Sequence, residues 1–177
     1  MYKLILASQS PRRKELLKMI ESEFEIKVSN CEEIITSSEP KQVTMELAEQ
    51  KAMAVATELN RQKKNDKQIE TTVKDEDSFI VIGADTVVAS GTEIFGKPKD
   101  KDDARRMINK ISGASHQVYT GVALVLVKGG KVERIDVFSE KTDVEVVHMS
   151  SQEIEEYINS TEPYDKAGGY GIQGTFG

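Results

Sequence analysis

Short apolar runs alternate along this chain with apolar residues at three-to-four spacing; the first pattern is typical of strands and the second of helices. The runs predict strands over residues 4–7, 24–28, 79–82, 118–127 and 132–147. Gly129 and Gly130 lie between the last two segments, and such a pair is typical of a hairpin turn. The sequence thus predicts a sheet in which a long hairpin forms the C-terminal part.

Spacing and end signals predict four helices. The first two cover residues 11–20 and 43–59. The second has a clear apolar stripe, formed by Met45, Ala48, Ala52, Val55 and Leu59. Asp100 can cap a third helix, and Ser150 with Glu153 forms a capping box for a fourth. Because strands and helices alternate before the hairpin, we expect an α/β fold with a mixed sheet.

Three segments carry no periodic pattern and indicate loops. Residues 29–41 are rich in Ser, Thr and Glu, and residues 168–174 are rich in glycine. Residues 60–78 are polar and charged, which predicts a solvated surface excursion within one domain that spans residues 1–177.

The bulk composition narrows the function classes. A net charge of −6 argues against a nucleic-acid partner, because general polyanion binders are usually basic. The apolar runs are too short to span a membrane and the N-terminus lacks a signal-peptide pattern, so we expect no membrane partner. Cys31 is the single cysteine, which excludes an internal disulfide and makes a cytoplasmic location the default.

The junction between the first strand and the first helix carries the clearest chemical signal. Ser10 suits the N-cap, Pro11 suits the first helical position, and Arg12 and Arg13 fall in the first turn. Two cations oppose the helix dipole there, whereas a bound phosphate would satisfy the dipole, the free N–H groups and both guanidinium groups. Two solvated arginines on a surface helix are the equally weighted alternative.

Charged residues elsewhere allow both a structural and a chemical interpretation. Asp85 interrupts an apolar stretch, so it either caps a turn after the strand or binds a metal ion and activates water. Lys97 lies between a glycine and a proline. It is either an exposed turn residue or a cation whose direction is set by the stiff backbone at the proline. Glu33 belongs to a loop that could approach such a site. His116 and His148 lack metal-ligand spacing, and we interpret both as structural.

Several of these segments, in order, resemble the Maf family of nucleoside triphosphate pyrophosphatases. The matching blocks are residues 6–17, 82–88, 96–98, 112–113 with His116, 119–122 and 162–174. The resemblance implies a mixed twisted sheet flanked by helices, with two lobes around a deep cleft, similar to inosine triphosphate pyrophosphatases. It also implies hydrolysis of a nucleoside triphosphate to the monophosphate and pyrophosphate, with Mg²⁺ or Mn²⁺ as the cofactor.

The resemblance assigns roles to individual residues. Asp85 would be the proton acceptor, and Asp85 with Glu33 would hold the metal ion. Substrate choice would rest on Arg12, Thr86 and Gln173. The phosphates would be bound by Ser8, Arg12, Arg13, Lys51 and Lys97.

The C-terminal block resembles the branch of the family that acts on dTTP and UTP. The Gln173 amide offers a donor and an acceptor, which match O4 and N3–H of uracil or thymine. The family pattern continues past this loop with a strand and a terminal helix, which we expect to be missing here. A non-catalytic nucleotide-binding regulator of cell division or septum formation is the alternative function. The oligomeric state stays open, a homodimer included.

Overall fold

The computed structural model describes residues 2–66 and 78–174, and it divides the chain into two compact units. The first unit comprises residues 1–85 and 121–139, and the second comprises residues 86–120 and 140–177. The division falls inside three long strands, β3 (Phe79–Ser90), β5 (Ser115–Lys128) and β6 (Lys131–Glu145).

The sheet contains parallel and antiparallel pairs, which confirms the expected mixed α/β fold. Its strands follow the order β2-β1-β3-β5-β6 in the described residues, with β4 (Glu93–Phe95) paired to β3. β1 (Lys3–Leu6) pairs in parallel with both β2 (Glu25–Ile26) and β3. β3 and β4 are antiparallel, joined through a turn at Gly91.

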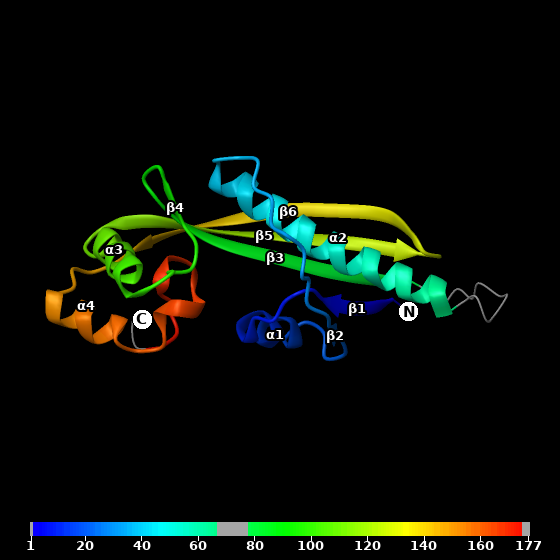
Figure 1. Ribbon diagram of the computed structural model, residues 1–177, viewed down its shortest axis with the longest axis horizontal. Coiled ribbons are helices and arrows are strands. Elements are labelled where there is room, and N and C mark those ends of the chain that lie inside the picture. Colours follow the sequence, from blue (N-terminus) through cyan, green and yellow to red (C-terminus); the bar gives the residue numbers. More distant parts are fainter. Residues whose placement is uncertain (1, 67–77, 175–177) are drawn as a thin grey trace. The chain divides into compact units, whose positions relative to one another are not determined.

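The long helix α2 (Pro40–Asp66) packs directly on the strands of the first unit (Figure 1). Two glycines permit this close approach. A Cβ built on Gly83 of β3 would lie 2.2 Å from the Ala48 carbonyl oxygen, and one on Gly121 of β5 would lie 2.2 Å from that of Thr44. Around this contact lies the core of the unit, which includes Ala52, Val55, Val81, Ala123 and Val125. The helix backbone is therefore held against the strand that carries Asp85.

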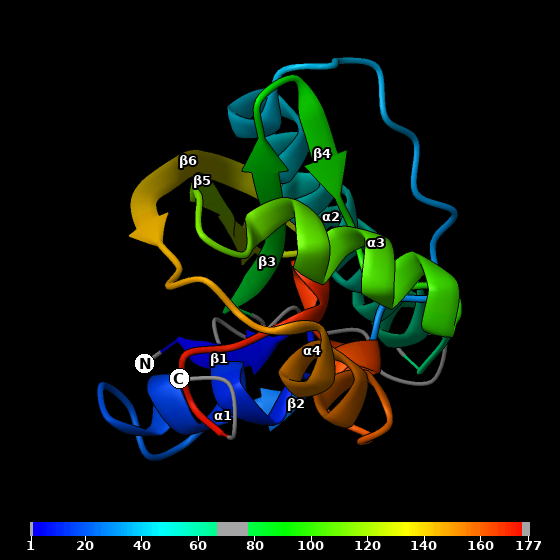
Figure 2. The same ribbon diagram turned by 90° about the vertical axis from the view of Figure 1, so that its left-hand side faces the viewer.

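The second unit has its own core, built on α3 (Lys101–Ile111) and α4 (Ser151–Ile158). Figure 2 shows these helices beside the C-terminal segment, which contains the short turns η2 (Pro163–Asp165) and η3 (Ala167–Gly169). Both predicted helix starts are confirmed. Asp100 accepts a hydrogen bond from the Asp103 N–H at 2.8 Å, and Ser150 with Glu153 forms the capping box.

Several predicted boundaries were wrong. The first helix, α1 (Pro11–Lys18), ends two residues early, and none of its residues is buried. Strand β2 keeps only two residues of the predicted 24–28. The sequence predicts a surface excursion from residue 60, but α2 continues to Asp66, because the backbone there still makes helical hydrogen bonds. The rest of that segment, residues 67–77, lies outside the described residues.

Asp85 lies inside a strand, which corrects one of its two interpretations. We expected a strand over residues 79–82 followed by a turn that Asp85 could cap. Instead β3 runs without interruption from Phe79 to Ser90. The Asp85 side chain, 15% exposed, meets its charged partner on α2. The turn-capping interpretation is therefore wrong.

Candidate functional site

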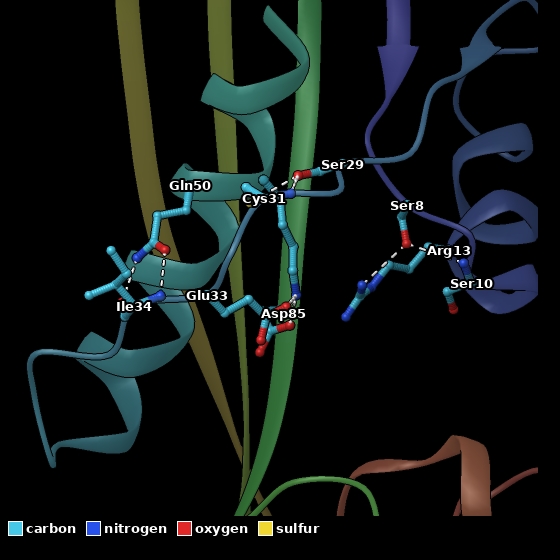
Figure 3. Close-up of polar contacts among 10 residues, drawn as sticks. Ser8, Ser10, Arg13, Ser29, Cys31, Glu33, Ile34, Gln50 and Asp85 are labelled. Carbon is cyan, nitrogen blue, oxygen red and sulfur yellow. Dashed lines mark hydrogen bonds and ion pairs between the residues drawn. The ribbon is translucent and has the colours of Figure 1, made fainter. Parts of the chain in front are cut away.

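The site in the first unit begins where β1 ends and α1 starts. Ser8 is buried, and its Oγ accepts hydrogen bonds from the Ser10 N–H at 3.2 Å and from Arg13 Nη1 at 3.3 Å (Figure 3). Ser10 is the N-cap with extended backbone, and Pro11 is the first helical residue, as predicted. Because a hydroxyl has two lone pairs and one proton, Ser8 retains its O–H for an acceptor such as a phosphate oxygen.

Arg13 is half-buried and lies in the electrostatic field of Asp85. Burial lowers the pKa of its guanidinium, the Asp85 carboxylate raises it, and the positive charge of Arg12 lowers it again. The net direction is downward, yet a guanidinium stays protonated in proteins. In Figure 3 the side chain extends from α1 toward the strand that carries Asp85. Arg13 thus brings a fixed positive charge to that strand, whereas Arg12 is exposed.

Lys51 joins the two carboxylates that the sequence marked. Its Nζ lies 2.9 Å from Glu33 Oε1 and also donates to Asp85 Oδ1. The Lys51 and Asp85 side chains are 18% and 15% exposed, and Glu33 is 48% exposed. Burial lowers the pKa of Lys51, but the charge of Asp85 and the hydrogen bonds to Asp85 and Glu33 outweigh it, so the pKa is raised. The ammonium is therefore charged at neutral pH.

The loop that carries Glu33 is tied to α2 at two points. The Gln50 side chain accepts from the Ile34 N–H at 2.9 Å and donates to the Ile34 carbonyl at 2.6 Å. Glu46 accepts from the Thr36 N–H at 3.0 Å and from its hydroxyl at 2.7 Å. Gln50 precedes Lys51 on the helix, so this clasp places Glu33 beside the Lys51 ammonium (Figure 3).

Sequence reasoning missed the Gln50 clasp. Gln50 lies on the polar side of a helix, and the amide of a loop residue sixteen positions away gives no periodic signal. Gln50 is adjacent to Lys51 in the sequence. It could be recognised as a site residue only once the loop that carries Ile34 was known to return to α2.

Two carboxylates that converge on one cation are a suitable donor set for Mg²⁺ or Mn²⁺. Magnesium usually takes one or two protein carboxylates and completes its shell with water and substrate phosphates. Asp85 and Glu33 match that pattern. Among residues 2–66 and 78–174 there is no cluster of three or more acidic, histidine or cysteine side chains that could form a fuller cage.

The remaining predicted site residues belong to the second unit. The Thr86 hydroxyl lies 3.1 Å from that of Thr120, which places a polar pair on adjacent strands. Lys97 and Gln173 are both exposed. The structure thus brings together Ser8 with Arg13, and Lys51 with Glu33 and Asp85, in one unit.

His116 has the structural role that we expected. It is fully buried in the second unit, and its Nε2 shares a hydrogen bond with the Tyr170 hydroxyl. Its Nδ1 has no hydrogen-bond partner in the part of the chain that the structure describes. The two rings meet edge to face with centroids 5.2 Å apart, so they fix the start of the glycine-rich tail.

The buried His116 predicts a loss of stability in mild acid. Burial lowers the pKa of His116 below 6.5, so the unfolded chain binds this proton more readily than the folded chain. The free energy of unfolding should fall as the pH drops below about 6.5, with a slope of at most ~1.4 kcal/mol per pH unit from this group.

Urea denaturation between about pH 7 and pH 5.5 measures this slope. His116→Gln should flatten this slope. Equal slopes for wild type and His116→Gln would contradict the assignment.

Fold and site together define an α/β protein with a charged site in its first unit. The chain belongs to the Maf-like protein family, whose model matches residues 3–177. No helix within the described residues combines the length and apolar character that a membrane crossing requires.

Several curated relatives share the full length of the chain. A protein of Agathobacter rectalis named dTTP/UTP pyrophosphatase is 49% identical over 177 residues, which is 99% of this chain and 84% of that protein. A Lachnoclostridium phytofermentans protein of the same name is 42% identical, over 99% of this chain and 81% of its own. Among solved structures, the Staphylococcus aureus Ham1 protein matches with a TM-score of 0.47 and 15% identity, over 81% of this chain and 71% of that one.

Proposed function

We propose that this chain is a nucleoside triphosphate pyrophosphatase that hydrolyses dTTP and UTP to the monophosphate and pyrophosphate. The observation that carries the proposal is the Lys51 ammonium bound between Glu33 and Asp85, in the unit that also presents Arg13 and Ser8. The full-length relatives named dTTP/UTP pyrophosphatase support the choice of substrates. The single cysteine supports a cytoplasmic setting.

Asp85 is the proposed general base. Its carboxylate accepts a proton from a water molecule as the water oxygen attacks the α-phosphorus, and the bond to the bridging oxygen of the leaving pyrophosphate breaks. Lys51 and Arg13 offset the negative charge that develops on the phosphates, and the Ser8 hydroxyl can donate to a phosphate oxygen. A divalent cation held by Asp85 and Glu33 would supply Lewis-acid stabilisation of the same oxygens.

Gln173 is the residue that we propose recognises the nucleotide base. Its amide offers one donor and one acceptor group to O4 and N3–H of uracil or thymine. An unrestrained amide could rotate to suit cytosine, so selectivity requires that the amide be fixed. Thr86 and Arg12 complete the proposed set that determines substrate choice.

Pyrophosphate release from a panel of nucleoside triphosphates, with Mg²⁺ or Mn²⁺, tests the function directly. We expect release from dTTP and UTP and slower release from CTP and the purine nucleotides. Equal rates for all nucleotides would contradict the substrate assignment. A folded chain that releases no pyrophosphate from any of them would contradict the enzyme assignment.

Arg13 should contribute mainly to triphosphate binding. Its guanidinium makes charge-assisted contacts, so Arg13→Met should weaken UTP binding by about 10- to 100-fold. Isothermal titration with metal-free protein measures the effect without turnover. Arg134→Met is the matched control, because Arg134 is an exposed arginine of the same unit, paired with Asp136 at 2.7 Å. Equal losses in both variants would show that only overall charge matters.

A further inference from the structure

Lys51 occupies the point where the two proposed metal ligands converge. Its ammonium contacts Glu33 Oε1 at 2.9 Å and also donates to Asp85 Oδ1; Figure 3 shows the two carboxylates close together. One cation thus bridges two carboxylates that come from a loop and from a strand. A divalent ion bound to the same two oxygen atoms would need the space and the charge position that Lys51 now holds.

Burial of Lys51 and Asp85 makes it costly to separate their charges. The Lys51 and Asp85 side chains are only 18% and 15% exposed, and a poorly hydrated charge without a partner is costly. In the chain as described, Lys51 supplies one positive charge against the two negative charges of Asp85 and Glu33. Arg13 adds a second positive charge in the field of Asp85. The two carboxylates are therefore held close together by the contacts of Lys51.

We propose that Lys51 is a place-holding cation, which keeps Glu33 and Asp85 together in the empty enzyme and is exchanged for the divalent ion. The inference rests on the proposed function, because it concerns the metal ligands of that reaction. Binding of the ion breaks the contacts of Lys51 with the carboxylates and frees its ammonium for the substrate phosphates. Lys51 therefore competes with the metal ion in the absence of nucleotide and serves the phosphates in its presence.

Mn²⁺ binding to the nucleotide-free protein tests the competition, with free Mn²⁺ followed by its electron paramagnetic resonance signal. Loss of a charge-assisted contact with each carboxylate predicts that Lys51→Met binds Mn²⁺ about tenfold more tightly than wild type. Lys51→Arg keeps the charge and should stay near wild type. If Lys51→Met folds poorly, as judged by circular dichroism, Lys51→Gln is measured in its place. Unchanged or weaker Mn²⁺ binding in these uncharged variants would overturn the proposal.

Lys3→Met is the matched control for the loss of one positive charge. Lys3 pairs with the single carboxylate of Glu25 at 2.5 Å, at a more exposed position of the same unit. Its replacement should leave Mn²⁺ affinity unchanged, and an equal gain in both variants would overturn the proposal. Asp85→Asn should remove the tight Mn²⁺ site, and retention of that site would also overturn it.

A crystal structure of the unaltered chain with Mn²⁺ provides a second test that needs no variant. We expect the ion on Asp85 and Glu33, with the Lys51 ammonium no longer in contact with either carboxylate. An ion bound there beside an undisturbed Lys51, or bound elsewhere, would refute the exchange. Neither measurement involves hydrolysis. Failure of the exchange is thus distinguished from failure of the proposed function, which pyrophosphate release reports.

Discussion

Asp85→Asn should reduce pyrophosphate release by about 10³-fold, which is typical for removal of a general base. Asparagine has nearly the same shape, but it cannot accept the proton of the attacking water and is a weaker ligand for a divalent ion. Nucleotide binding to the metal-free protein should persist, because Arg13, Lys51 and Ser8 remain and one negative charge is lost. Pyrophosphate release and isothermal titration with UTP measure the two effects separately.

Asp136→Asn is the control for this experiment. Asp136 lies on β6 in the same unit and pairs with Arg134 at 2.7 Å, at a position that our mechanism does not use. Its replacement should leave turnover unchanged. An active Asp85→Asn variant would mean that another group accepts the proton. Loss of both turnover and metal-free binding would assign Asp85 a role in holding the site together instead.

Gly83→Ala should lower the free energy of unfolding by about 3 kcal/mol, the upper end of the cost of overpacking a core. The added Cβ would lie 2.2 Å from the Ala48 carbonyl oxygen and 2.8 Å from the Ala52 nitrogen. Both are backbone atoms of α2, so the helix or the strand must shift. Because Lys51 lies on that helix and Asp85 on that strand, turnover of the folded variant should also fall.

Urea denaturation measures the stability change, and activity well below the melting temperature measures the effect on the site. Gly96→Ala is the stability control, because a Cβ there would meet no atom within 4 Å. It should alter the free energy of unfolding by only a few tenths of a kcal/mol. If Gly83→Ala were as stable as Gly96→Ala, α2 would not be as tightly packed on β3 as the structure indicates.

The elements with strong local signals could be predicted from the sequence. The apolar face of α3 is buried as expected, at Ala104, Met107, Ile108 and Ile111, and both caps formed at the predicted serine and aspartate. Boundaries that depend on tertiary pairing were wrong. β2 has only two paired residues next to β1, and β3 extends through Asp85 because its neighbours continue the sheet.

For the candidate site, the structure places part of the predicted residue set in one unit, and the contacts among these residues could not be predicted. The spacing of Ser10, Pro11 and Arg13 indicated an anion site, and the structure adds that Ser8 orients Arg13. Lys51 was assigned to phosphates, and its contacts with Glu33 and Asp85 depend on a loop that folds back on α2. No periodic pattern encodes such a return, because it relies on single side chains such as Gln50.

The most direct test of water attack on the α-phosphorus is hydrolysis of UTP in water enriched in ¹⁸O. Mass spectrometry then locates the label in the two products. Attack of water on the α-phosphorus places the label in UMP and leaves pyrophosphate unlabelled. We expect one labelled oxygen per UMP formed. Label in pyrophosphate, or formation of UDP and inorganic phosphate, would show that water attacks a different phosphorus and would contradict the mechanism proposed for Asp85.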